Sequence, residues 1–261
     1  MSPYTPLRRQ LFRWLWIASL VGYIGDWVQN VGAAWLMTDL SASALMVSLV
    51  QAASNLPYFF LAVPAGALAD IVDRRRLLLV TQGWMLLVAA ALAAITLTGH
   101  ITPWLLLSMT LLLGVGSAFN DPAWEATPPE LVPKDEVPAA VALDGVSVNV
   151  GRVIGPALGG LLVAAAGAGA AFLLNALSFV GFLAVLMSWR RSPQASVLPA
   201  ERWVGAMRAG LRYIRHAPAL QAVIVRALLF VVGGSSLWAL LPLVARADPT
   251  RGPAQYGILL G

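Results

Sequence analysis

The stretch Gly66-Ala-Leu-Ala-Asp70-Ile-Val-Asp73-Arg74-Arg75-Arg76 decides the fold of this chain, because it separates two long apolar segments. The segments on either side, 44–69 and 77–98, each exceed the roughly 20 helical residues that cross a bilayer. A short connection that carries two acids and a basic triplet indicates a tight turn at the cytoplasmic membrane surface. The stretch therefore predicts a pair of neighbouring membrane-spanning helices.

Composition extends this prediction to the whole chain. Of its 261 residues, 59% are hydrophobic and 11% are charged, whereas soluble domains carry about 25% charged residues. Backbone groups in lipid need internal hydrogen bonds, so the apolar runs should be helices. We expect an all-α membrane protein with spans at 11–37, 44–69, 77–98, 103–120, 138–166, 171–189 and 217–244, and an eighth helix that opens near 256.

The basic residues indicate topology. Thirteen of the 17 Lys and Arg residues fall in segments on the side of the amino terminus, and only Arg246 and Arg251 fall on the other side. Positive charge gathers on the cytoplasmic side of membrane proteins, so the amino terminus should be cytoplasmic and the protein multi-pass. The net charge of +5 then reflects orientation in the membrane. We expect the lipid bilayer as a partner and no nucleic acid.

Several chemistries find no support in the sequence. The chain has no cysteine, so disulfides and thiolate metal sites are excluded, and His100 and His216 are too far apart to suggest a metal site. It contains no Gly-x-x-x-x-Gly-Lys-Ser/Thr phosphate loop. No arrangement of catalytic residues is recognisable. We expect no enzyme, no cofactor and no metal.

The chain divides into three parts. Residues 1–189 should form a bundle of six transmembrane helices, 190–216 a cytoplasmic linker, and 217–261 the start of a second, incomplete bundle. Within the linker, apolar residues recur at helical spacing over 203–214 and arginines occupy another face. This pattern is typical of an amphipathic helix that lies on the membrane surface; a regulatory or partner-binding helix is the alternative.

The fifth predicted helix carries the motif Gly151-Arg-Val-Ile-Gly155-Pro156-Ala-Leu-Gly159-Gly160. Glycines four residues apart share one helix face and allow another backbone to approach closely. Pro156 removes a hydrogen bond and favours a bend. The motif suits a helix along which two bundles rock past each other, although simple close helix packing would use the same glycines.

Charged residues within spans are costly, about 2.5–3.5 kcal/mol at the bilayer centre, so each one is a functional candidate. Asp26 lies in the middle of the first span, with Gln29 and Asn30 nearby. Arg152 lies in the fifth span, close to Asn149. We consider these five residues candidates for binding protons or substrate. The alternative is a structural ion pair of Arg152 with Asp26 or with Asp144.

These motifs resemble those of the major facilitator superfamily. Residues 66–76 are similar to its loop between helices 2 and 3, and the helix-5 pattern is similar to the antiporter motif of its drug:proton exporters. Further phrases resemble exporters of enterobactin and macrolides, of the transmembrane secretion effector type. They include Gly25-Asp26-Trp27, Phe119-Asn120-Asp121-Pro122-Ala123-Trp124, Asn175-Ala-Leu-Ser-Phe179 and Ala239-Leu-Leu-Pro-Leu243.

The resemblance implies a gating turn formed by Gly66, Asp70, Asp73, Arg74 and Arg75, in which Asp70 binds a helix end of the opposite half. The turn departs from the family pattern in two places, since Ile71 follows Asp70 where a basic residue is usual and Asp73 replaces a glycine. These substitutions leave the position of the turn unchanged and its details open.

The resemblance also implies a function: proton-coupled efflux of a small organic solute by alternating access, in the bacterial inner membrane. Drugs, macrolides and siderophores all fit as substrates. Because family members have twelve helices, the missing carboxyl-terminal half is expected as an intramolecular partner. A truncated, transport-inactive bundle or assembly partner is the alternative, and a passive channel is a third possibility.

Overall fold

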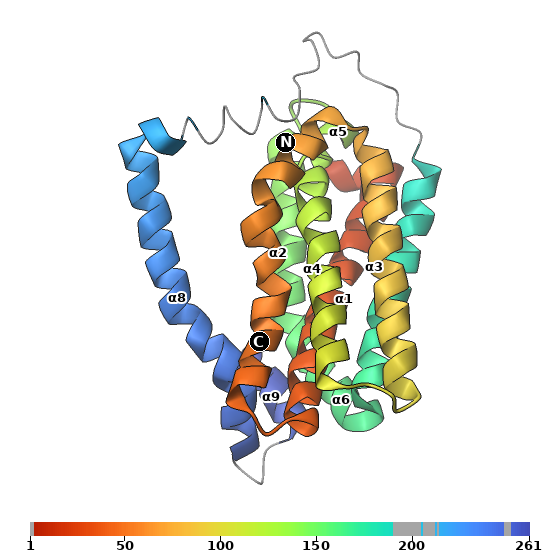
Figure 1. Ribbon diagram of the computed structural model, residues 1–261. Helices are drawn as coiled ribbons and strands as arrows, with labels where there is room; N and C mark the ends of the chain where they lie inside the picture. The colour runs from red at the N-terminus through yellow and green to blue at the C-terminus, as the bar shows by residue number, and fades with distance from the viewer. Residues whose placement is uncertain (1–2, 190–204, 206–211, 213, 248–251) are drawn as a thin grey trace.

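The fold is a bundle of long antiparallel helices (Figure 1). A computed structural model describes residues 3–189, 205, 212, 214–247 and 252–261. Its helices are η1 (Thr5–Arg8), α1 (Gln10–Leu40), α2 (Ala44–Ile71), α3 (Arg74–Leu97), α4 (Pro103–Glu125), α5 (Pro128–Leu131), α6 (Val137–Ser188), α8 (Pro218–Ala247) and α9 (Pro253–Leu260). The predicted all-α membrane fold is confirmed, while the predicted amphipathic helix at 203–214 lies outside the described residues.

Helix α6 contains both the fifth and the sixth predicted span. It runs for 52 residues and is interrupted at Gly167, whose φ of 79° lies in the left-handed region that favours glycine. The chain reverses there, so α6 crosses the bundle twice, as Figure 1 shows. The α1–α6 bundle therefore consists of six passes.

Several helix boundaries differ from the prediction by one to five residues, and two of these differences have a clear cause. Helix α3 begins at Arg74 rather than at 77, because the Asp73 side chain accepts a hydrogen bond from the Arg76 backbone N–H and caps the helix. Helix α4 continues to Glu125 rather than ending at 120. Pro122 lies in its last turn and removes only one hydrogen bond there, so the helix tolerates it.

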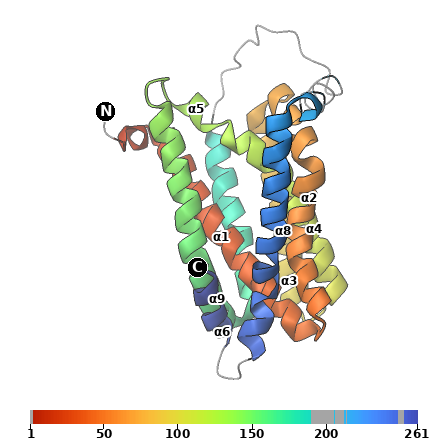
Figure 2. The ribbon, with the colours of Figure 1, turned by 90° about the vertical axis from the view of Figure 1, so that its left-hand side faces the viewer.

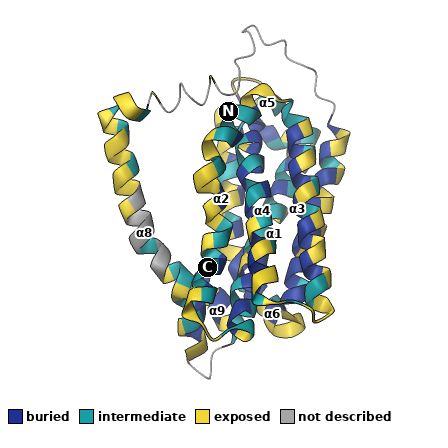
Figure 3. Cartoon of the chain, viewed as in Figure 1, coloured by how far each residue is buried: buried dark blue, intermediate teal, exposed yellow. Residues whose placement is uncertain are grey.

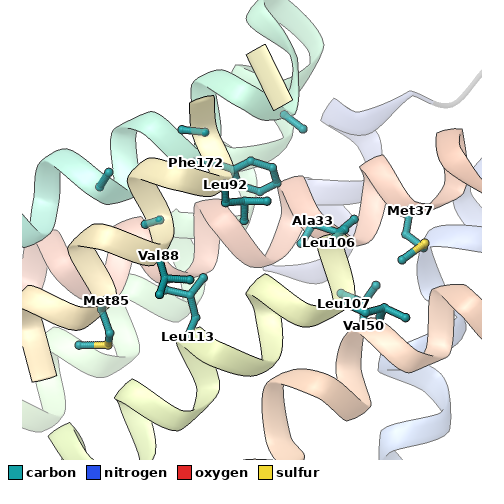
Figure 4. Packing of buried hydrophobic residues seen from close by; sticks show 14 of the residues in the cluster. Ala33, Met37, Val50, Met85, Val88, Leu92, Leu106, Leu107, Leu113 and Phe172 are labelled. Carbon is teal, nitrogen blue, oxygen red and sulfur yellow. The ribbon is translucent and has the colours of Figure 1, made fainter. Parts of the chain in front are cut away.

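The largest buried cluster of the bundle lies between α1, α2, α3, α4 and α6. Figure 4 shows Phe172 beside Leu92 and Leu106 beside Ala33, with Met37 at the far side of the cluster. Met37, Leu92, Leu106 and Phe172 are all fully buried. Small residues such as Ala33 lie between these larger side chains and allow close helix packing.

The outside of the bundle is apolar, as a lipid environment requires. Figure 3 shows exposed residues on the outward faces of the helices, and these include Phe59, Leu87 and Leu177. Helices α2, α3, α4 and α6 are long and apolar enough to span a membrane. In the most apolar part of α2 only 17% of the residues are buried, against 44% in α3 and in α4, so α2 lies at the edge of the bundle.

Helices α8 and α9 contact the α1–α6 bundle at the end opposite the amino terminus. Figure 1 shows α8 diverging from α2 toward the other end, and Figure 2 shows α9 against the first pass of α6. The contacts of α8 with the bundle come from its carboxyl-terminal part, in which Arg246 binds Asp39 and Trp238 meets Trp27. Val223 and Leu229, in the diverging part, are exposed.

Candidate functional site

The predicted candidate Asp26 belongs to a polar cluster between α1 and the second pass of α6. Asn175 is almost fully buried, and its side-chain amide donates hydrogen bonds to Asp26 at 3.3 Å and to Gln29 at 2.7 Å. The Ser178 hydroxyl donates to the Asn175 side-chain oxygen at 3.2 Å. These bonds fix the Asp26 carboxylate on the wall of a cavity.

Gly25 makes this cluster possible. A Cβ atom at this position would stand 2.6 Å from Asn175 Oδ1 and 2.9 Å from Ser178 Oγ, which is too close for any real side chain. Glycine therefore lets α6 approach α1 until the Asn175 amide reaches Asp26. The glycine that permits this close approach of α6 therefore directly precedes Asp26, whose carboxylate the approach positions.

A second carboxylate, Asp121, lies in the same region and was not among the predicted candidates. Because α4 continues past 120, Asp121 is helical, and its carboxylate accepts a hydrogen bond of 2.7 Å from the Tyr58 hydroxyl of α2. The neighbouring Asn120 accepts bonds from Thr81 and Gln82 of α3. Asp121 and Asn175 both appear in the sequence as polar residues in apolar surroundings, and that signal could have identified them.

Three adjoining cavities connect these residues. The carboxylate cavity is lined by Asp26, Asp121 and Tyr23 among others, and the middle cavity shares Asp26, Met85 and Ser117 with it. The middle cavity in turn shares Asn30, Ser54 and Asn55 with an aromatic cavity of about 300 Å³, which is lined by Trp27, Trp238, Tyr256 and Arg152. Small-molecule sites begin at about this volume.

The predicted ion-pair alternative for Arg152 is wrong for the described part of the chain. The Arg152 guanidinium carbon lies 5.5 Å from the centre of the Trp238 ring of α8. Asp26 instead binds Asn175, and Asp144 accepts a 3.0 Å hydrogen bond from the Trp124 indole. Asp26 and Arg152 therefore lie in different cavities that the middle cavity joins.

Two of the three remaining candidates line the cavities, and the third does not. Gln29 and Asn30 line the middle cavity, and Asn30 also reaches the aromatic cavity. Asn149 is exposed on α6, and its amide donates to the Gly145 carbonyl of the same helix. The structure does not bring Asn149 into the Asp26 cluster.

The helix-5 motif faces two neighbours rather than one. A Cβ atom on Gly151, Gly155 or Gly159 would lie 2.5–3.0 Å from atoms of Tyr23, Trp27 or Val28, so this glycine stripe packs against α1. A Cβ on Gly160 would instead lie 3.0 Å from the Cα of Gly257 in α9. The interpretation of the stripe as a sliding surface is therefore wrong for the first three glycines, which serve close packing inside the bundle.

The gating-turn candidates make contacts within the α1–α6 bundle. Arg74 donates to the Ala126 carbonyl and to the Glu130 carboxylate at 2.6 Å, which ties the turn to the connection after α4. Arg75 donates to the Leu186 and Met187 carbonyls at the end of α6. Asp70 is exposed, and a Cβ on Gly66 would meet nothing within 4 Å, so these two residues are not needed for packing among the described residues.

The arrangement of helices matches known transporters. A bacterial homologue of the human lysosomal transporter Spinster, in an inward-facing and unoccupied conformation, has a TM-score of 0.72 and 16% identity, and the match covers 98% of this chain and 59% of that one. Identity this low shows the fold alone. The fold is therefore that of a membrane transporter, with apolar outward faces and polar cavities inside the bundle.

Within that class the chain belongs to the transmembrane secretion effector family, whose model matches residues 1–261. The Staphyloferrin A transporter of Staphylococcus aureus is 27% identical over 89% of this chain and 58% of its own length. The multidrug efflux pump Tap of Mycolicibacterium fortuitum is 27% identical over 80% and 53%. Macrolide efflux protein A of Streptococcus pyogenes is 22% identical over 90% and 58%. The chain spans just over half the length of these relatives.

Proposed function

We propose that this protein exports a small organic solute across the bacterial plasma membrane in exchange for protons, by alternating access. Family membership makes it a transporter rather than an enzyme. The relatives named above are a transporter of Staphyloferrin A, a multidrug efflux pump and a macrolide efflux protein, which supports export of a small organic molecule. Proton coupling and alternating access are our inferences for this chain.

The position of Asp26 is the observation that carries the proposal. Its carboxylate lies in α1, the first predicted span, on the wall shared by two cavities, and is held by the neutral amide of Asn175. No cation among the described residues pairs with it, so a proton is the natural partner for its charge in a medium of low polarity. Such a carboxylate can bind a proton from one side of the membrane and release it to the other.

The contacts of α8 support alternating access. They are concentrated at the end of the bundle away from the amino terminus, where Arg246 contacts Thr38 and Asp39. When two bodies touch at one end and diverge at the other, a rocking motion can open the end that is in contact and close the end that diverges. We propose that residues 1–189 form one body, that 217–261 begin the other, and that 190–216 link them on the cytoplasmic side.

The orientation follows from the basic residues. Arg9 precedes α1, Arg74 and Arg75 begin α3, and Lys134 lies between α5 and α6, all at the end of the bundle where the chain starts. Arg246 lies at the opposite end, where it contacts Asp39 in the last turn of α1. By the positive-inside rule the amino-terminal end is cytoplasmic. In this orientation the diverging part of α8 lies toward the cytoplasm.

The test is dye uptake into everted membrane vesicles made with the protein expressed from its complete gene, because export from the cytoplasm appears in everted vesicles as uptake. An imposed pH gradient should drive transport of a fluorescent dye, and Asp26→Asn should lower the gradient-driven rate by about tenfold or more, since a neutral amide takes up no proton. Asp135→Asn, which removes a carboxylate from an exposed turn, is the matched control and should transport normally. Full coupling with unchanged pH dependence in D26N would remove Asp26 from the mechanism, and flux independent of the gradient would indicate a channel.

A further inference from the structure

Arg152 is an exposed cation in the first pass of α6 that contacts an aromatic ring and makes no hydrogen bond or ion pair with a described residue. Its guanidinium lies over Trp238, while the described ion pairs join Arg9 to Glu136, Arg74 to Glu130 and Arg246 to Asp39. None of the residues that line the aromatic cavity is an Asp or a Glu. Within the described chain, the positive charge of Arg152 is therefore balanced by no acid.

An unpaired guanidinium in such a place is suited to bind an anion. A charge at membrane depth is costly and marks a substrate or ion pathway. The contact with Trp238 orients the guanidinium, but no N–H of Arg152 donates a hydrogen bond to a described residue. Guanidinium N–H groups form a planar fork that matches the two oxygens of a carboxylate.

The rest of the aromatic cavity fits an amphiphilic body. Trp27 and Trp238 have ring centres 6.4 Å apart, and Tyr256 lines the same space. The side-chain amides of Asn30, Gln51 and Asn55 line its polar wall and can accept or donate hydrogen bonds. Aromatic walls with a few polar groups are typical of sites for small organic molecules.

We propose that the aromatic cavity binds its solute by a carboxylate group placed on Arg152, so that the exported molecules are anionic amphiphiles. This inference rests on the proposed transport function and specifies its substrate class. Asp26 and Asp121 line the carboxylate cavity, and the middle cavity separates Asp26 from Arg152. In this proposal Asp26 binds the proton, and Arg152 binds the carboxylate of the solute.

The experiment compares two probes that differ only in charge. Dansylglycine carries a carboxylate, and dansylglycinamide is its neutral amide. Binding to the protein, expressed from its complete gene and purified into lipid nanodiscs, is followed by the rise in dansyl fluorescence. We expect dansylglycine to bind about tenfold or more tightly than the amide, because hydrogen bonds to charged groups are the stronger ones. Arg152→Met should remove this preference and leave the affinity for the amide unchanged.

Two further variants guard against a merely structural effect. Arg152→Lys keeps the charge but loses the planar fork, so it should retain a reduced carboxylate preference. Arg226→Met removes a different cation, exposed on α8 and absent from the lining of the aromatic cavity, and should behave as the wild type. If R152M fails to fold, a carboxylate preference as strong in R152K as in the wild type would contradict the proposed fork.

The inference fails if wild-type protein binds neither probe, binds both equally, or prefers a cationic dansyl amine, and it also fails if R152M still prefers the carboxylate. These outcomes are distinct from those for proton coupling. The wild type can drive dye efflux with a pH gradient while showing no carboxylate preference, and this would overturn only the substrate class. A carboxylate preference without gradient-driven efflux would overturn only the proposed function.

Discussion

The Glu136 carboxylate, at the start of α6, accepts two hydrogen bonds from the Arg9 guanidinium, of 2.9 and 3.0 Å. The Glu136 side chain is 10% exposed and that of Arg9 44% exposed, so solvent screens only one side of the pair. These hydrogen bonds hold the pKa of Glu136 below its ordinary value. The pair joins the start of the chain to the first pass of α6.

This pair predicts a pH dependence of stability. A carboxylate whose folded pKa is depressed stabilises the fold above its unfolded pKa, about 4.3, and loses that contribution as the pH falls through the folded pKa. Glu136→Gln should therefore unfold at a lower temperature than the wild type at pH 7, and the gap should narrow toward pH 3. Thermal unfolding in detergent measures the difference. Arg9→Gln should lower the unfolding temperature in the same way. A difference in unfolding temperature that stays constant with pH would contradict a stabilising role of the Arg9–Glu136 pair.

At the same scale, the Asp26 cluster shows why neutral partners matter. Asn175 holds the carboxylate in place with its amide and adds no charge to the cluster. A cation at the position of Asn175 would hold Asp26 ionised. A neutral partner is therefore consistent with the proton exchange that we propose for Asp26.

At the scale of elements, the pairing of α1 with α6 is the most extensive contact among the described helices. The glycine stripe of Gly151, Gly155 and Gly159 receives Tyr23, Trp27 and Val28 of α1. Gly155 is the tightest of the three positions, since a Cβ atom there would stand 2.5 Å from Trp27 Cβ. The stripe therefore fixes the register between the two helices.

Gly155→Ala should destabilise the protein by about 1–3 kcal/mol, as overpacking of a close contact does. Gly181→Ala in the second pass of the same helix is the matched control, since a Cβ there meets nothing within 4 Å. That variant should gain up to about 1 kcal/mol from the higher helix propensity of alanine. Denaturant titration in mixed micelles measures both. Equal stabilities of the two variants would mean that the stripe is not a packing surface.

On the scale of the whole molecule, α8 contacts α1 at the end of the bundle opposite the amino terminus. The Arg246 guanidinium donates to the Thr38 hydroxyl at 2.6 Å and to the Asp39 carboxylate at 2.5 Å. Both members of the ion pair are about half exposed, so its free energy is of the order of 0.2–1 kcal/mol. A contact this weak can open and close during a transport cycle.

Asp39→Asn should open this end of the transporter more often, by about two- to fivefold from the energy of an exposed pair. Because these 261 residues contain no cysteine, a single cysteine introduced at Ala239, on the wall of the aromatic cavity, can report the opening. Its reaction with a membrane-impermeant maleimide, added outside intact cells, should accelerate in D39N. The charge-swapped variant D39R/R246D should restore the slower rate. Unchanged labelling in both D39N and R246A would show that the pair is no gate.

Much of the fold was predictable because it depends on local properties. Hydropathy and backbone preference can be derived from the residues of each segment alone. They account for the apolar runs, the charged turn at 66–76 and the break at Gly167. The errors lay at helix ends, where the Asp73 cap and the tolerance of Pro122 moved the boundaries by a few residues. Because the predicted fourth span ended at 120, Asp121 was placed in a loop and was not considered as a site residue.

The sequence by itself determined that the chain crosses a membrane many times, which end gathers positive charge, and that Asp26 and Arg152 are unusual in such surroundings. Only the tertiary structure decided what these residues meet. Asp26 meets Asn175 rather than Arg152, and Arg152 meets Trp238. Helix length and orientation follow from neighbouring residues and the surrounding lipid, whereas the contents of a cavity depend on the rotation and packing of helices that are distant in the chain.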